Sequence, residues 1–146
     1  MENVNITKSK KNKIKLDFKD SKYATGRRKK SIAKVWVKKG SGNIHVNGLK
    51  MNEYFKRPVH QILVTRPLEI TEATSNYDIK CSVKGGGLSG QAGAIILGIS
   101  KALIAHDEST KKNLKKDKLT TRDSRVVERK KYGHRKARRS FQFSKR

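Results

Sequence analysis

The sequence is short of cysteine, histidine and acidic residues. Cys81 is the only cysteine, so the chain cannot form an internal disulfide, and a small secreted fold held by disulfides is not expected. The histidines are scattered singly, and one cysteine cannot complete a zinc site, so we expect no metal and no other cofactor. Because it falls on the apolar side of a predicted strand, Cys81 is interpreted as a small core residue rather than a nucleophile.

Long apolar runs are also missing. Apolar residues make up 34% of the chain, against roughly 45–50% in an average domain, so the core must be small and confined to part of the sequence. The longest apolar run, AGAIILGISKALIA, is interrupted by Gly98, Ser100 and Lys101. It falls short of the ~18–20 residues that span a bilayer, and no membrane partner is expected.

The first residues have no apolar signal region, and they are poor in arginine and carry Glu2, Asp17 and Asp20. This composition is not typical of a secretory signal or of a cleaved mitochondrial presequence. We therefore expect a cytoplasmic protein or one made inside an organelle, with the mitochondrial matrix among the alternatives.

Basic residues, by contrast, are abundant. The chain of 146 residues has 37 Lys and Arg against 12 Asp and Glu, a formal net charge of +25. Such a charge repels itself unless a polyanion neutralises it. The composition therefore predicts a nucleic-acid partner.

The excess charge is greatest in residues 121–146, where no carboxylate follows Glu128. Tyr132, Phe141 and Phe143 place flat stacking surfaces among the cations, and arginine dominates after Gly133. Arginine pairs bidentately with phosphate and stacks on bases, so this pattern favours RNA or DNA binding. A disordered tail that improves solubility is the alternative interpretation.

The remaining patterns predict a small α/β (α+β, two-layer) domain over residues 23–120, between a flexible Lys-rich extension at 1–22 and an extended basic tail at 121–146. Strands are expected at 32–37 and 43–48, paired as a hairpin through the turn residues 40–42, and at 77–83 with Tyr77, Ile79, Cys81 and Val83 facing inward. Helices are expected within 49–55, at about 59–64 with Pro67 bending or restarting the chain, from Ser89 or Gly90 to His106 or Asp107, and through 111–118.

The segment GGGLSG formally matches the dinucleotide pattern GxGxxG. The strand that should follow the next helix is absent, and the pattern of a P-loop is absent too, so no small-molecule substrate is expected. Ser89 has no convincing base nearby in the sequence, and we find no catalytic constellation. The turn could still hold an RNA phosphate on exposed N–H groups, or it could simply be a tight turn that needs positive φ angles; both interpretations remain open.

Four blocks together carry a family resemblance: YATGRRKKSIAKVWVK, GSGNIHVNG, YDIKCSVKGGGLSGQAGAI and TRDSRVVERKKYGHRKARRSFQFSKR. In this order they resemble the ninth protein of the small ribosomal subunit, of the bacterial and organellar type. The resemblance implies a small sheet with helices packed on it, similar to the second domain of ribosomal protein five of the same subunit. It also implies a non-enzymatic component of the subunit head.

The same resemblance implies the partners: 16S-type rRNA, peptidyl-site tRNA and neighbouring head proteins. The tail would thread between RNA helices, and Ser144, Lys145 and Arg146 would approach the anticodon stem-loop of the tRNA. The implied rRNA contacts are Arg27, Arg28, Lys29, Lys30, Gly85, Gly86, Gly87, Ser89, Gly90, Gln91, Arg122, Arg125, Arg129, Lys130, Lys131, Arg135, Lys136, Arg138 and Arg139.

The chain departs from the family at two places that bear on the interface. Ile96 and Leu97 stand where the family usually has a basic residue and histidine, which suggests tighter packing or a protein neighbour there. Asp117 and Lys118 replace an alanine-glycine helix ending. The alternatives from other function classes are a histone-like architectural DNA protein and an RNA-modifying enzyme. The first shares the charge but should show repeated groove-reading elements and self-association, which the sequence does not show. The second needs a cofactor pocket or catalytic residues, and the failed dinucleotide pattern is its only support.

Overall fold

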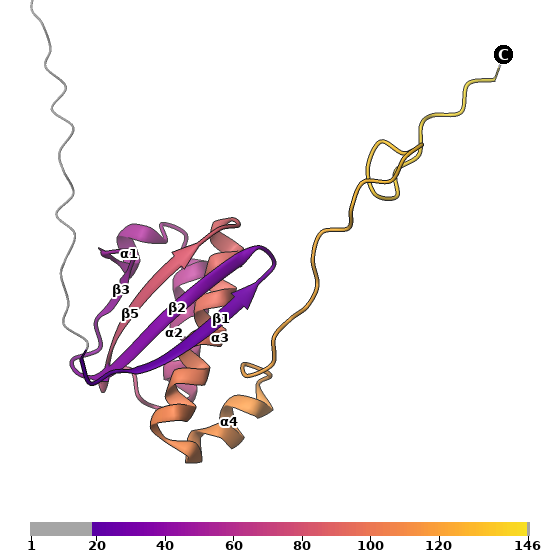
Figure 1. Cartoon of the computed structure of the whole chain (residues 1–146). Helices are drawn as coiled ribbons and strands as arrows, with labels where there is room; N and C mark the ends of the chain where they lie inside the picture. Colours follow the sequence, from indigo (N-terminus) through magenta and orange to yellow (C-terminus); the bar gives the residue numbers. More distant parts are fainter. Residues whose placement is uncertain (1–18, 146) are drawn as a thin grey trace, which may run out of the picture.

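The computed structural model describes residues 19–145 (Figure 1). The extension expected at 1–22 therefore lies mostly outside the described residues, as does Arg146. A folded body extends from the first strand to the last helix, and the C-terminal chain runs away from it (Figure 1).

The body contains a mixed five-stranded sheet in the order β1-β2-β5-β3-β4. β1 pairs antiparallel with β2, β2 with β5, and β3 with β4, whereas β3 and β5 run parallel. The strands are β1 Lys22–Arg28, β2 Ser31–Lys39, β3 Ile44–Val46, β4 Leu49–Lys50 and β5 Tyr77–Lys84.

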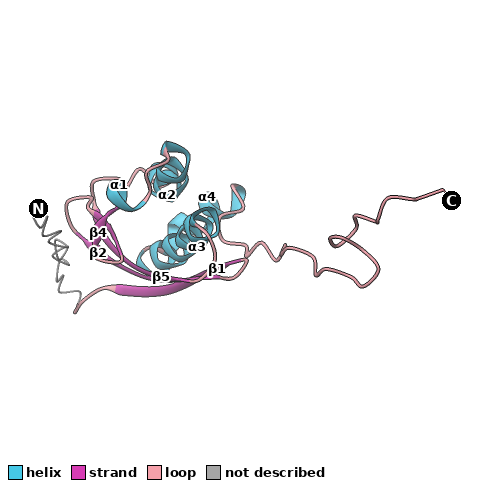
Figure 2. Cartoon of the chain, turned by 90° about the horizontal axis from the view of Figure 1, so that it is seen from above, coloured by secondary structure: helices cyan, strands magenta, loops and turns pink. Residues whose placement is uncertain are grey.

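The helices all pack on one face of this sheet, so the body has two layers (Figure 2). The expected fold, a small sheet with helices packed on it, is confirmed. The helices are α1 Met51–Tyr54, α2 Pro58–Ile70, α3 Leu88–His106 and α4 Lys111–Lys116, with a 3-10 turn at Glu108–Thr110 before α4.

The core lies between the sheet and α3. In β5, Tyr77, Ile79, Cys81 and Val83 face inward, as their alternation predicts. Burial raises the pKa of the Cys81 thiol to about 12, so it stays a neutral core group at physiological pH. Although α3 has the length and apolar composition of a membrane-spanning helix, it is the central core helix here, with most of its inward side chains fully buried.

β1 and α3 approach closely because glycines face each other at the contact. A Cβ atom on Gly26 would collide with the Ala94 carbonyl oxygen and would lie 2.6 Å from the Gly98 nitrogen. A Cβ on Gly98 would in turn lie 2.5 Å from a methyl group of Val35. Small residues at these positions therefore set the depth at which the helix sits on the sheet.

The prediction that residues 32–37 and 43–48 pair as a hairpin is wrong. β2 forms its hairpin with β1, and β5 lies between β2 and β3. Asp78 explains the crossing, because its carboxylate accepts hydrogen bonds from the backbone N–H groups of Ser41 (3.0 Å) and Asn43 (2.9 Å). These bonds hold the loop of residues 41–43 against the start of β5. The chain can then pair β3 with the edge of β5 that faces away from β2.

Two other elements differ from expectation. α2 continues through Pro67 to Ile70, because the buried proline ring packs in the core and only one backbone donor is missing. α1 is shorter than the expected 49–55 segment, since Leu49 and Lys50 pair with β3 instead.

Candidate nucleic-acid interface

The tip of the β1–β2 hairpin and the glycine turn after β5 lie against each other. The Ser31 hydroxyl donates a hydrogen bond to the Gly85 carbonyl oxygen at 3.0 Å. A Cβ on Gly85 would lie 2.5 Å from the Lys30 carbonyl oxygen, and one on Gly86 would collide with the Ser31 hydroxyl. The fold thus brings together two of the segments expected to contact RNA, which are far apart in the sequence.

The turn itself has the geometry that the tight-turn interpretation requires. Gly85 and Gly86 have φ angles of 73° and 62°, a region that favours glycine. Lys29 at the hairpin tip also has a left-handed φ, of 50°. The glycines therefore have a structural role here, and phosphate binding at the turn remains a prediction.

A hollow of about 840 Å³ opens beside this contact. The first residues of α2 and α3 contribute to its wall, and helix N-termini carry partial positive charge. Four cations line it against one carboxylate, so the charge of the lining favours an anionic ligand. Its lining residues are Lys29, Lys30, Arg57, His60, Gly86, Gly87, Leu88, Ser89, Gly90, Val126, Val127, Glu128 and Arg129.

His60 in this wall corrects the expectation that Ser89 has no base nearby. The His60 Nε2 atom lies 3.0 Å from the Ser89 hydroxyl oxygen, a contact that sequence spacing cannot reveal. The other ring nitrogen, Nδ1, is buried and has no hydrogen-bond partner among the described residues. A serine nucleophile needs a base that a third group orients, so this pair lacks the arrangement of a catalytic triad.

A cluster of polar contacts joins the C-terminal chain to the body; we call it the arm root, formed by Arg28, Asp123 and Arg125. The Arg28 guanidinium lies 3.0 Å from the Asp123 carboxylate and donates a hydrogen bond to the Arg125 carbonyl oxygen at 2.7 Å. Hydrogen bonds from Arg125, with the charges of Arg125 and Arg28, hold the pKa of Asp123 well below its usual range. Of the residues expected to contact rRNA, Arg28 is thus already engaged within the protein.

The apolar residues that depart from the family pattern lie next to this root. Leu97 is only 5% exposed and, with Ile96, lines a small hollow shared with Asp123 and Lys118. Leu97 therefore packs in the protein, as the tighter-packing alternative predicted, whereas Ile96 is only half-buried and a protein neighbour there stays a prediction. Lys118 has a φ of 57°, the left-handed conformation that the glycine usual at this place adopts without strain.

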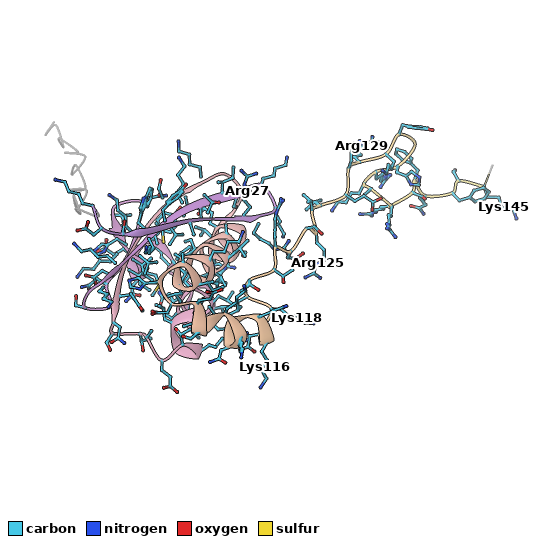
Figure 3. The ribbon with its side chains drawn as sticks, turned by 60° about the horizontal axis from the view of Figure 1, so that its bottom comes forward. Arg27, Lys116, Lys118, Arg125, Arg129 and Lys145 are labelled. Atoms are coloured by element: carbon cyan, nitrogen blue, oxygen red, sulfur yellow. The ribbon has the colours of Figure 1, made fainter. Side chains whose placement is uncertain are left out.

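Beyond the root, residues 126–145 form an extended arm that projects from the body (Figures 1 and 3). Its first residues, up to Arg129, line the hollow beside the hairpin tip, and Lys145 lies near its far end (Figure 3). All the arm cations expected to bind RNA are exposed except Lys131, which is partly covered.

The arm contains one local loop. Glu128 pairs with Arg138 at 3.0 Å and with Lys131 at 3.9 Å, and His134 forms a bridge with Ser140. The rings of Tyr132 and Phe143 nevertheless stay 96% and 87% exposed. Exposed rings of this size among cations that far outnumber the single carboxylate of the arm suit a partner that offers both phosphates and flat bases.

In residues 19–145 no group of three or more His, Cys, Asp or Glu side chains is placed to hold a metal ion. A family model described as ribosomal protein S9/S16 matches residues 26–146. The matched range covers the hairpin tip, the glycine turn, the arm root and the arm.

Proposed function

This chain belongs to the ribosomal protein S9/S16 family, and from that premise we propose that its body anchors in the head of the small subunit while its arm reaches the peptidyl-site tRNA. Family membership makes the chain a structural protein of the small ribosomal subunit, located in ribosomes of the cytoplasm or of an organelle. It binds rRNA and acts in translation, as a member of a family that is generally non-enzymatic.

The arm is the observation that carries the proposal. It leaves the body at a fixed root, contains no helix in its described residues, and keeps its cations and rings in solvent. An arm of this composition cannot bury itself, because desolvating unpaired charges costs more than a short segment recovers. Folded RNA supplies the missing counter-charge, and the arm threads between its helices.

The body supplies a second set of rRNA contacts. Lys29, Lys30 and Arg57 surround the hollow at the glycine turn, where the N-terminal ends of α2 and α3 add partial positive charge. A backbone phosphate of 16S-type rRNA fits this chemistry. Neutralisation of phosphates gives affinity, and RNA shape gives most of the specificity, since A-form grooves offer side chains little sequence to read.

At the far end of the arm, Ser144, Lys145 and Arg146 contact the anticodon stem-loop of the tRNA. Cations that pair with the sugar-phosphate backbone stabilise every tRNA alike, whatever its codon. Lys145 is exposed and makes no described ion pair, which suits this role. Neighbouring proteins of the head complete the environment of the body.

The test is the dissociation rate of tRNA from the peptidyl site of small subunits that carry a chain lacking residues 144–146. Removal of the terminal cations should speed dissociation while assembly stays intact. The matched control is Lys112→Gln, which removes one exposed cation from α4 and should leave the rate unchanged. Equal dissociation rates for the truncated and full chains would refute the tRNA contact.

A further inference from the structure

One face of the sheet has no helix packed on it (Figure 2). The strand register places on this face an ordered array of side chains that neither the hollow nor the arm uses. The register aligns them in rows across β1, β2 and β5. Successive rows are Tyr23–Trp36–Lys80, Thr25–Lys34–Ser82 and Arg27–Ile32–Lys84. We call the side chains of these three rows the strand platform.

Two rings form the aromatic part of the strand platform. The centroids of Tyr23 and Trp36 lie 5.4 Å apart, with the ring planes inclined by 43°. Tyr23 is 49% exposed, and Ile32 two rows away is 44% exposed. Trp36 thus braces a tyrosine ring that presents much of its surface to solvent, on a rigid part of the fold.

The charge around the rings has one sign. Arg27, Lys34 and Lys84 are exposed on this face, and the Lys80 ammonium lies 5.9 Å from the Trp36 ring centroid. Asp78 is the acidic residue of β5 on this face, and backbone N–H groups of Ser41 and Asn43 already occupy its carboxylate. Arg27, Lys34 and Lys84 form no ion pair with the described residues and can neutralise an external anion.

The platform is also continuous with the proposed rRNA contacts. Its last row, Arg27–Ile32–Lys84, adjoins the hairpin tip and the glycine turn, because Lys29 and Lys30 follow β1 directly and Gly85 follows Lys84. A strand of RNA that leaves the hollow can therefore pass the tip and run along the sheet.

From these observations we propose that the strand platform binds unpaired nucleotides of RNA. A base stacks on Tyr23, whose orientation Trp36 fixes, and Lys34 and Arg27 pair with the flanking phosphates. The occupant is single-stranded because paired bases of an A-form helix do not offer their faces to a ring. Base–aromatic stacking on a cationic surface is the chemistry by which proteins hold single strands without reading their sequence.

Trp36 is the only tryptophan of the chain, so its fluorescence reports on this surface alone. The first experiment titrates the full chain with oligouridylate, and with a duplex RNA of the same phosphate count as control. Oligouridylate should quench Trp36, and the duplex should quench it far less although it also binds the arm. Equal quenching by both ligands, or by neither, would overturn the proposal.

Two substitutions then separate stacking from charge and from folding. Tyr23→Ala should lower the affinity for oligouridylate, measured by this quenching, by about 5- to 150-fold, the cost of one lost base stack. Tyr23→Phe keeps the ring, so its affinity should stay near that of the unmodified protein. Thermal unfolding of both variants checks that the body remains folded. If Tyr23→Ala titrates like Tyr23→Phe with both variants folded, the platform does not stack a base.

The same site can be examined on assembled small subunits by ultraviolet cross-linking of Trp36. A cross-link to an rRNA nucleotide supports the proposal. A cross-link to a neighbouring protein assigns the face to a protein contact and overturns it, as does a Trp36 that is freely quenched by acrylamide. Since neither the arm nor the tRNA site includes Tyr23, failure here leaves the proposed function untouched.

Discussion

Arg28 in β1 and Asp123 after α4 form an ion pair at 3.0 Å that joins the folded body to the start of the arm. Asp123 also accepts hydrogen bonds from the side chain and the backbone N–H of Arg125. One carboxylate therefore organises two arginines that would otherwise repel each other. This contact links β1 directly to the segment where the arm leaves the body.

Replacing Asp123 should loosen the arm root with little change in global stability, because exposed ion pairs contribute little to folding. In Asp123→Asn the backbone N–H hydrogen of Arg125 should exchange with solvent faster. Its 3.0 Å hydrogen bond then has an uncharged and therefore weaker acceptor. Hydrogen exchange at Arg125 is the measurement. Glu108→Gln, at a 4.0 Å pair with Lys111, is the control, and an unchanged Arg125 amide would contradict the role given to Asp123.

The contact of β1 with α3 should tolerate no side chain at Gly26. Gly26→Ala introduces a Cβ that collides with the Ala94 carbonyl oxygen, so it should lower the free energy of unfolding by about 1–3 kcal/mol. Gly87→Ala is the matched control, because nothing lies within 4 Å of its added Cβ. Urea unfolding should separate the two variants, and similar midpoints would disprove the close approach of β1 and α3.

Asp78 should stabilise the crossing loop in a pH-dependent way. Burial opposes its ionisation, but hydrogen bonds from the Asn43 and Ser41 backbone and from the Ser41 hydroxyl lower its pKa overall. Asp78→Ala should cost about 1–2 kcal/mol of unfolding free energy at neutral pH. Because the folded pKa is depressed, this contribution is present above the unfolded value of roughly 3.9 and is lost as the pH falls through the folded pKa.

Unfolding measured at pH 7 and at the lowest pH where the protein stays folded tests this sign. The difference in unfolding free energy between Asp78→Ala and the unmodified chain should become smaller as the pH is lowered. Glu53 is an exposed residue of α1, so Glu53→Ala should have nearly the same unfolding free energy as the unmodified chain at both pH values. A gap that is constant or widens toward acid pH would be inconsistent with the loop contacts of Asp78.

Periodicity in the sequence predicted the elements whose pattern is local. Alternating apolar residues predicted the strand β5, and apolar residues at helical spacing predicted the helix α3. Cys81 was correctly assigned to the core. The pairing of strands was predicted wrongly, because β2 and β3 both pair with β5, which lies more than 30 residues further along the chain. No strand was predicted for β1, where four consecutive cations follow Gly26, although the close packing of α3 requires glycine at this position.

The RNA contacts stay a prediction. The family resemblance implied that the cations of the arm and the glycine turn bind RNA, and the fold brings that turn to the hairpin tip. It could not show that Arg28 pairs with Asp123, nor that His60 reaches Ser89. Each of these contacts joins residues whose local sequence gives no signal of the partner.

Binding of the isolated chain to 16S-type rRNA should depend steeply on salt. If about six to ten phosphates are contacted, affinity should fall by about 10³- to 10⁵-fold between 50 and 200 mM salt. A salt titration of the dissociation constant measures this slope. A shallow slope would point to mainly apolar docking of the body.

The central claim is that the arm is held by rRNA, and the most direct measurement is competition for incorporation into small subunits that lack this protein. A chain that ends at Glu128 competes with the full chain, and a chain that lacks only residues 144–146 serves as control. The full chain and the control should enter equally, and the chain ending at Glu128 should be displaced. Equal incorporation of all three would show that the arm does not anchor the protein.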